Sequence, residues 1–169
     1  VSGSLVPEHP TGSRLPDLGP RGEGWVVLQV ALLLAVFGAA AWGPPWPSAL
    51  RVIVRTAGIA GLTAGAALAL AGSRTLGRAL TPLPKPAADA SLRDEGAYRL
   101  VRHPIYGGVM MMAFGGSLLG SPAALLPAAL LILLFEGKRL REERWLSDRY
   151  PEYTAYRERV PRRFLPFLW

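Results

Sequence analysis

The stretch that decides the fold is residues 105–135, IYGGVMMMAFGGSLLGSPAALLPAALLILLF. This apolar run is longer than the roughly 20 residues that one membrane-spanning helix needs. Gly120-Ser-Pro122 lies near its middle, where a proline removes a backbone donor and breaks a helix. The run therefore predicts two short helices in a hairpin.

The charges on either side of this run support the same prediction. The 73–104 loop and the tail after Glu136 are both rich in arginine and lysine. Positively charged loops stay in the cytoplasm, so loop and tail on one side require an even number of crossings between them. We expect both termini and the 73–104 loop to be cytoplasmic, in a bacterial plasma membrane.

Two further apolar runs, 24–43 and 49–72, are each long enough to span a bilayer. The Gly-Pro-Pro-Trp-Pro turn between them predicts a tight hairpin. Residues 25–42 also resemble a signal peptide, but the apolar stretch is longer than a usual signal core. The chain has no cysteine, which excludes disulfides and thiolate metal sites.

The expected fold class is an all-α integral membrane protein. It has two full spans, a short helical hairpin and a cytoplasmic C-terminal amphipathic helix. Residues 1–23, rich in Gly, Pro and Ser, read as a flexible leader, and residues 24–72 as a two-helix membrane hairpin. Glycines recur at helical spacing in the second and third apolar runs, which predicts close helix packing there.

The segment RLVRHPIYGG, residues 99–108, precedes the hairpin. Pro104 suits the first position of a helix, and His103 would then occupy the cap. Free N–H groups in the first turn and the helix dipole would attract an anion. The expected anion site consists of Arg102, His103, Pro104, Tyr106, Gly107 and Gly108, with the glycines leaving room for a ligand. The alternative is an interfacial cluster bound to lipid headgroups.

The segment EGKRLREERWLSDRY, residues 136–150, predicts a helix with segregated charges. One face would carry Glu136, Arg139, Glu142, Glu143 and Leu146, and the opposite face Lys138, Arg141, Arg144 and Trp145. The acidic face turned inward would attract a cation, and the basic face would suit anionic headgroups. An ordinary solvated helix is the alternative. Together, the two sites suit a zwitterion with an added positive centre, and S-adenosylmethionine has these charges.

The motifs resemble the isoprenylcysteine carboxyl methyltransferase family, including its phospholipid-methyltransferase-like members. Its pattern is Gly-x-Tyr-x-x-x-Arg-His-Pro-x-Tyr-x-Gly, an apolar hairpin, Arg-x-x-Glu-Glu, Tyr-x-x-Tyr and Val-Pro. The first of these elements is GAYRLVRHPIYGG, and the last three fall in residues 139–161, RLREERWLSDRYPEYTAYRERVP. The resemblance covers about residues 74–166.

The resemblance implies transfer of a methyl group from S-adenosylmethionine to a lipophilic acceptor, of which a carboxylate is one kind. Residues 73–169 would bind the donor. It implies that Tyr98, His103, Tyr106 and Gly108 contact the donor, that Glu142 and Glu143 hold its charged end, and that Arg139 or Arg162 orients the acceptor. Glu142 would also serve as a base where the acceptor needs one. No metal and no nucleic-acid partner are expected.

Two other functions remain open at the level of sequence. Membrane sterol reductases also carry an Arg-His-Pro-x-Tyr segment and bind a nicotinamide cofactor there, so a reductase of an isoprenoid or sterol-like lipid is one alternative. The paired glutamates disfavour it, because an acidic face does not suit a polyanionic cofactor. A non-catalytic membrane binding protein is the other.

Overall fold

The computed structural model describes residues 18–85 and 91–166, so most of the expected leader lies outside the described residues. The described part is helical and contains no strand. In chain order its elements are α1 (Glu23–Trp42), η1 (Ser48–Leu50), α2 (Arg51–Leu76), η2 (Gly77–Ala79), η3 (Gly96–Arg99), α3 (Pro104–Leu119), η4 (Pro122–Ala124), α4 (Leu125–Arg149) and α5 (Tyr153–Arg159).

The expected break in the long apolar run is confirmed. Helix α3 ends at Leu119 and α4 begins at Leu125, with Ser121 and Pro122 between them. The Ser121 hydroxyl accepts a hydrogen bond from the Ala123 N–H at 3.2 Å and so caps the short η4 turn. The amphipathic tail is not a separate helix, because α4 continues without interruption from the apolar run to Arg149.

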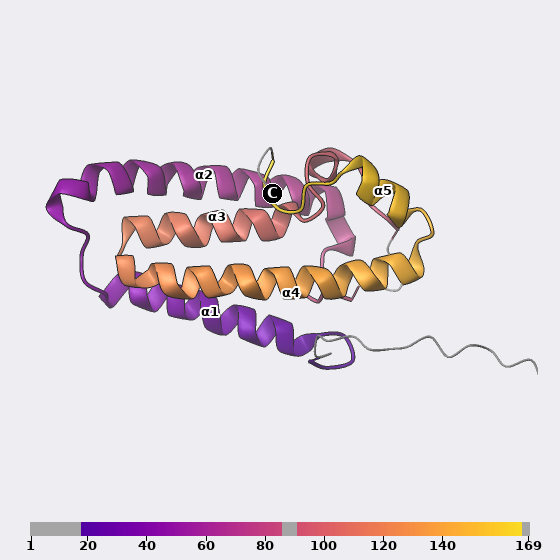
Figure 1. Cartoon of the computed structure of the whole chain (residues 1–169), viewed down its shortest axis with the longest axis horizontal. Coiled ribbons are helices and arrows are strands. Elements are labelled where there is room, and N and C mark those ends of the chain that lie inside the picture. Colours follow the sequence, from indigo (N-terminus) through magenta and orange to yellow (C-terminus); the bar gives the residue numbers. More distant parts are fainter. Residues whose placement is uncertain (1–17, 86–90, 167–169) are drawn as a thin grey trace, which may run out of the picture.

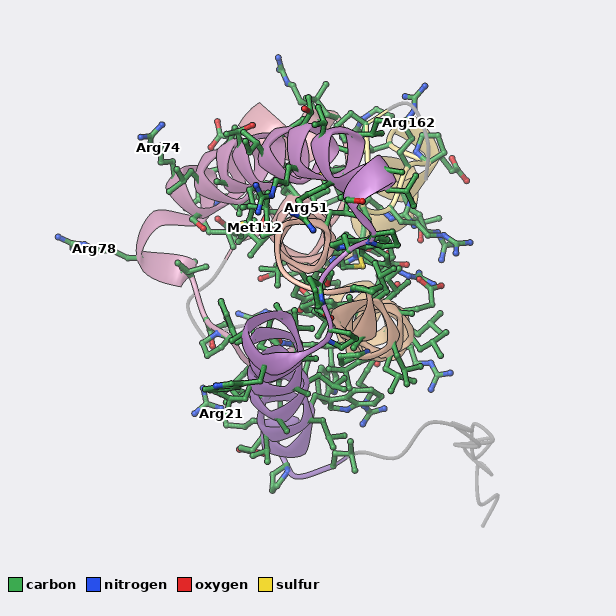
Figure 2. The ribbon with its side chains drawn as sticks, turned by 90° about the vertical axis from the view of Figure 1, so that its left-hand side faces the viewer. Arg21, Arg51, Arg74, Arg78, Met112 and Arg162 are labelled. Carbon is green, nitrogen blue, oxygen red and sulfur yellow. The ribbon has the colours of Figure 1, made fainter. Side chains whose placement is uncertain are left out.

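Helix α3 lies in the middle of the bundle, with α2 on one side and with α4 and α1 on the other (Figures 1 and 2). The expected tight hairpin of the first two helices is therefore not formed. Their linker instead crosses the closed end of the α3–α4 hairpin. Ser121 Oγ donates to the Pro44 carbonyl at 2.7 Å and Trp46 Nε1 to the Ser117 carbonyl at 3.2 Å, which anchors the linker there.

The close packing predicted from the glycines is confirmed between α2 and α3. A Cβ added at Gly58 would lie 2.8 Å from the Gly115 carbonyl oxygen. A Cβ added at Gly108 would lie 2.5 Å from the Gly65 carbonyl oxygen. The two backbones approach so closely that there is no room for a side chain at these positions.

We expect Gly108→Ala to destabilise the bundle by about 1–3 kcal/mol, because the added methyl group would push α3 away from α2. Gly116 provides the matched control on the same helix, since nothing lies within 4 Å of a Cβ built there. Thermal unfolding in detergent measures both variants. A midpoint for Gly108→Ala equal to that of Gly116→Ala would contradict this packing.

Among the described residues, two segments are long and apolar enough to cross a membrane, Glu23–Trp42 and Ser48–Ala79. Many of their large apolar side chains face outward, including Val27, Phe37 and Val52. Such a surface is suited to lipid and would be costly in water. The expected sidedness of the loop and tail stays a prediction.

Candidate active site

Pro104 is the first residue of α3 and His103 precedes it, as predicted. The His103 side chain does not cap the helix. The backbone N–H of His103 instead donates to the Arg163 carbonyl at 2.8 Å, and the N–H of Gly107 donates to the His103 carbonyl at 3.0 Å. The C-terminal segment therefore lies against the residue before α3, and the Gly107 N–H is used within the first turn of the helix; the anion site expected at this helix start stays a prediction.

Gly107 and Gly108 do not clear a path for a ligand, which corrects the expected geometry. A Cβ added at Gly107 would lie 2.0 Å from the Phe164 carbonyl oxygen, and Gly108 faces α2. Pro104 is buried and lies against Gly72 of α2. These three residues hold the start of α3 against the rest of the chain.

Glu143 is the centre of a buried ion network. Its Oε1 accepts from Arg102 Nε and pairs with His103 Nε2, both at 3.0 Å, and its Oε2 accepts from Arg139 Nη1 at 3.0 Å. Arg139 also pairs with Glu136. Because three side chains already satisfy this carboxylate, it is not available for the charged end of a ligand.

The same partners determine how Glu143 ionises. Burial alone would raise the pKa of this carboxyl group. The hydrogen bonds and charges of His103 and Arg102 outweigh burial and lower the pKa to about 2. Glu143 is therefore a fixed negative charge that links α4 to the residues just before α3.

Glu142 has a different environment, although it is the next residue. Its Oε2 accepts a hydrogen bond from the Tyr106 hydroxyl at 2.6 Å and lies 3.7 Å from His103 Nδ1. The His103 and Tyr106 rings are stacked, with centroids 5.3 Å apart. The carboxylate of Glu142 is partly exposed, and it lines both chambers described next.

Two adjoining chambers meet at this carboxylate. The loop-side chamber is formed mainly by residues that follow α2 and by the ends of α4 and α5; its lining includes Ser91, Arg93, Tyr98, Arg102, Glu142, Tyr150, Tyr153 and Tyr156. The helix-side chamber, of about 310 Å³, lies among the four long helices; its lining includes Gln29, Ser73, Tyr98, His103, Ile105, Tyr106, Phe135, Lys138 and Glu142. Leu76, Thr81, Tyr98 and Glu142 line both.

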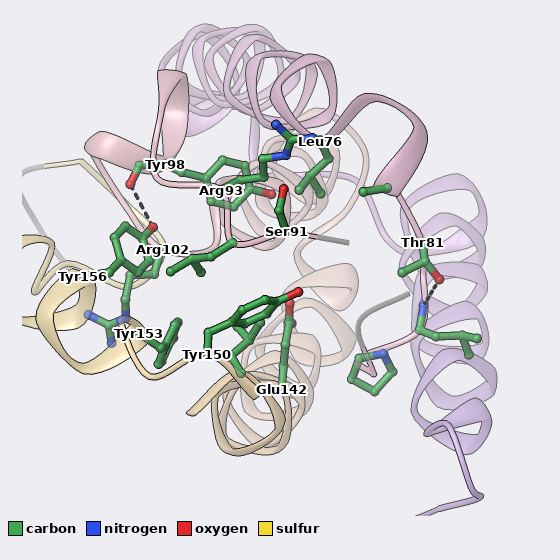
Figure 3. A pocket seen from close by; sticks show the side chains of 15 residues that line it. Leu76, Thr81, Ser91, Arg93, Tyr98, Arg102, Glu142, Tyr150, Tyr153 and Tyr156 are labelled. Carbon is green, nitrogen blue, oxygen red and sulfur yellow. Dashed lines mark hydrogen bonds between the residues drawn. The ribbon is translucent and has the colours of Figure 1, made fainter. Parts of the chain in front are cut away.

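The loop-side chamber has polar atoms without partners. Figure 3 shows Glu142 and Tyr150 on one side of it and Arg93 and Tyr98 on the other. The Tyr153 hydroxyl and Arg93 Nε are buried and have no hydrogen-bond partner among the described residues. Buried polar groups are nearly always paired, so two orphaned atoms in one chamber indicate a place for a polar ligand.

Lys138 lies in the helix-side chamber, which corrects the prediction that it shares an outer basic face with Arg144. Only 1 % of its surface is exposed, whereas Arg144 is exposed. Lys138 Nζ donates to Gln29 Oε1 on α1 at 2.6 Å and lies 5.1 Å from the centre of the Tyr106 ring. Of the residues expected to meet lipid headgroups, Lys138 is thus turned toward α1, whereas Arg144 remains exposed.

The structure brings five of the predicted site residues to the chambers: Tyr98, Arg102, His103, Tyr106 and Glu142. It places Arg139 in the Glu143 network instead, and the exposed Arg162 points away from the bundle (Figure 2). Sequence reasoning missed the orphaned atoms of Arg93 and Tyr153 and the lysine at position 138. The spacing of Tyr153 and Tyr156 places both tyrosines on one face of α5. This spacing could have indicated Tyr153 as a site residue.

The chain was compared with protein-family models, with curated proteins and with solved structures. The model of the family described as phospholipid methyltransferase matches residues 53–153, which contain most of both chambers. The chain is also 30% identical over 175 residues to the cobalt-zinc-cadmium resistance protein CzcN of Cupriavidus metallidurans, across 98% of this chain and 74% of the relative. No solved structure matches the chain significantly. The chain therefore belongs to the phospholipid methyltransferase family, which is isoprenylcysteine carboxyl methyltransferase-like, as its motifs indicated.

Proposed function

We propose that the protein transfers a methyl group from S-adenosylmethionine to a lipophilic acceptor at the cytoplasmic face of the membrane. The observation that carries the proposal is the pair of chambers that meet at Tyr98 and Glu142. The loop-side chamber has polar atoms without partners, and the helix-side chamber opens among the four long helices. Such a pair suits a reaction between a polar donor and a lipid-like acceptor, in a family of membrane methyltransferases.

The residues of the loop-side chamber suit the donor. Glu142 would hold its positively charged end, and the guanidinium of Arg93, whose Nε is orphaned, would hold its carboxylate. The orphaned hydroxyl of Tyr153 is a further donor or acceptor, and the tyrosine rings offer faces for the adenine. Burial raises the pKa of Tyr98 and of Tyr153, so both phenols stay protonated. The chamber thus provides groups for each part of the cofactor.

In methyl transfer the protein mainly positions the donor and the acceptor, and it forms no covalent bond to either. When bound, S-adenosylmethionine would supply an electrophilic methyl carbon, which an acceptor atom could attack in line with the C–S bond, with S-adenosylhomocysteine as the leaving group. The chain holds the acceptor close to that group and excludes water. A carboxylate acceptor is ionised at neutral pH and needs no base. For an amine or phenol acceptor, Glu142 would take the proton; its Oε2 lies 3.7 Å from His103 Nδ1.

The apolar surfaces of α1 and α2 give the acceptor a route from the bilayer. The walls of the helix-side chamber include Leu76, Ile105, Val109 and Phe135. A hydrocarbon chain gains about 0.8 kcal/mol for each methylene that such walls bury. A lipophilic acceptor would therefore enter between helices, while the donor enters from the side of the 73–104 loop.

Transfer of labelled methyl groups tests this function. Membranes from cells that express the protein are incubated with methyl-labelled S-adenosylmethionine, and the label in the organic extract is counted. We expect the wild type and Arg144→Gln to label extractable material and Glu142→Gln to do so at least tenfold more slowly. Arg144 is exposed on the same helix, so it serves as the matched control. Equal labelling by membranes with and without the protein would contradict the proposal.

A further inference from the structure

Lys138 differs from every other buried charged side chain of the described residues. Arg102, Arg139 and His103 each pair with Glu143. Lys138 is 1 % exposed, yet no carboxylate of the described residues lies within 4.0 Å of its ammonium group. Its one hydrogen-bond acceptor there is the neutral Gln29. The buried positive charge therefore has no directly paired carboxylate, although the charge of Glu142 acts on it.

An uncompensated buried charge is costly, and an ammonium group has three N–H donors to satisfy. The side chain lies over the Tyr106 ring, 5.1 Å from its centre, and over the Phe135 ring at 5.8 Å. These contacts attract the cation weakly but accept no conventional hydrogen bond. Glu142 lines the same chamber and its charge acts on Lys138, but the hydrogen bond that its Oε2 accepts comes from the Tyr106 hydroxyl and not from the ammonium group.

Gln29 adds a second donor at the same place. Its Oε1 accepts from Lys138 Nζ at 2.6 Å, which leaves the two amide N–H groups of this side chain for another acceptor. Gln29 also lines the helix-side chamber. An ammonium and an amide thus lie together at one wall of the chamber, with N–H donors left for an acceptor on a ligand.

We propose that Lys138 and Gln29 form an anion subsite in the helix-side chamber, which holds the carboxylate or phosphate headgroup of an amphiphile whose hydrocarbon chain packs on Ile105, Val109 and Phe135. Assigning this amphiphile as the methyl acceptor rests on the proposed function. The binding itself does not depend on it. The chamber volume of about 310 Å³ lies at the lower end of the range for ligand sites, so it suits a headgroup and part of one chain.

Equilibrium dialysis of labelled twelve-carbon amphiphiles against the full chain in a neutral detergent tests the subsite. The probes are dodecanoate, dodecyl phosphate, dodecanol and dodecylamine. We expect the wild type to bind at least one anion more tightly than the alcohol and the amine. Lys138→Met should weaken anion binding about ten- to a hundredfold, as expected for loss of one charged hydrogen bond, and Gln29→Leu should weaken it less.

Arg144→Met is the matched control, because it removes an exposed cation from the same helix. It should bind all four probes like the wild type. Preference for dodecanoate identifies a carboxylate headgroup, and preference for dodecyl phosphate identifies a phosphate. Equal anion affinity in the wild type and a folded Lys138→Met, or no preference for an anion in the wild type, would overturn the subsite. If Lys138→Met does not fold, Gln29→Leu and the wild-type preference decide the question.

Binding of S-adenosylhomocysteine to the same preparations separates this proposal from the previous one. Anion binding that depends on Lys138, without binding of S-adenosylhomocysteine, would support the subsite and contradict the methyltransferase. Binding of S-adenosylhomocysteine without any anion preference would support the methyltransferase and contradict the subsite.

Discussion

Glu142→Gln is expected to weaken binding of S-adenosylhomocysteine to the purified protein about ten- to a hundredfold. The substitution removes a negative charge from the junction of the two chambers while keeping the shape of the side chain. Loss of a hydrogen bond to a charged group costs about 1.5–3 kcal/mol, which corresponds to this change in affinity. Isothermal titration calorimetry in detergent measures it.

The fold should survive this change. Glu142 is partly exposed, and the Tyr106 hydroxyl can donate to a glutamine oxygen as it does to the carboxylate. Arg144→Gln should bind S-adenosylhomocysteine like the wild type. Equal affinities in all three proteins would show that the acidic group at position 142 does not contact the donor.

Glu143→Gln is expected to act on stability instead, with a loss of about 3–5 kcal/mol. Removing one partner of a buried ion network leaves the others with uncompensated charge. Here Arg102 and Arg139, which are 6 % and 5 % exposed, would lose their shared carboxylate. Thermal unfolding in detergent measures the effect, with the exposed Glu158→Gln as control. A midpoint unchanged from that of the wild type would contradict the network.

The same network predicts how the wild type responds to acid. The pKa of Glu143 is about 2 in the folded chain, below its ordinary value of 4.5. A carboxyl group with a lowered pKa contributes its stabilisation fully above pH 4.5 and loses it as the pH falls toward 2. Between these values, the stability of the wild type should fall more steeply than that of Glu143→Gln. Parallel curves of stability against pH for the two proteins would show that a group other than Glu143 determines the response to acid.

The start and the end of α3 could be predicted because both depend on local chemistry. Proline is confined to the first turn of a helix, so Pro104 marks where α3 begins, and Gly120 to Pro122 mark where it ends. The contacts between Gly65 and Gly108 follow the same logic, since small residues allow close approach.

The neighbours of each helix could not be predicted from local patterns. The proline-rich linker after α1 indicates a turn, but not that α3 and α4 lie between α1 and α2. For the same reason the sequence could not show that the C-terminal segment covers Gly107. Both depend on contacts between residues far apart in the chain.

The charges of α4 illustrate the limit most clearly. Glu142 and Glu143 were placed on one face, yet they differ by about 100° around the helix axis. The structure directs Glu143 into the ion network and Glu142 into the chambers. Lys138 precedes Glu142 by four residues, so the two side chains lie on the same face of α4. The expected segregation of charges had placed them on opposite faces. The pattern gives relative angles, and only the packing of α1 shows which angle faces the site.

Titration of the purified wild-type protein with S-adenosylhomocysteine and, separately, with NADPH tests the central claim most directly, namely that the chambers at Glu142 form a methyl-donor site. Calorimetry in detergent reports both affinities without knowledge of the acceptor. We expect saturable binding of S-adenosylhomocysteine at one site per chain and no binding of NADPH. Binding of NADPH without binding of S-adenosylhomocysteine would contradict it.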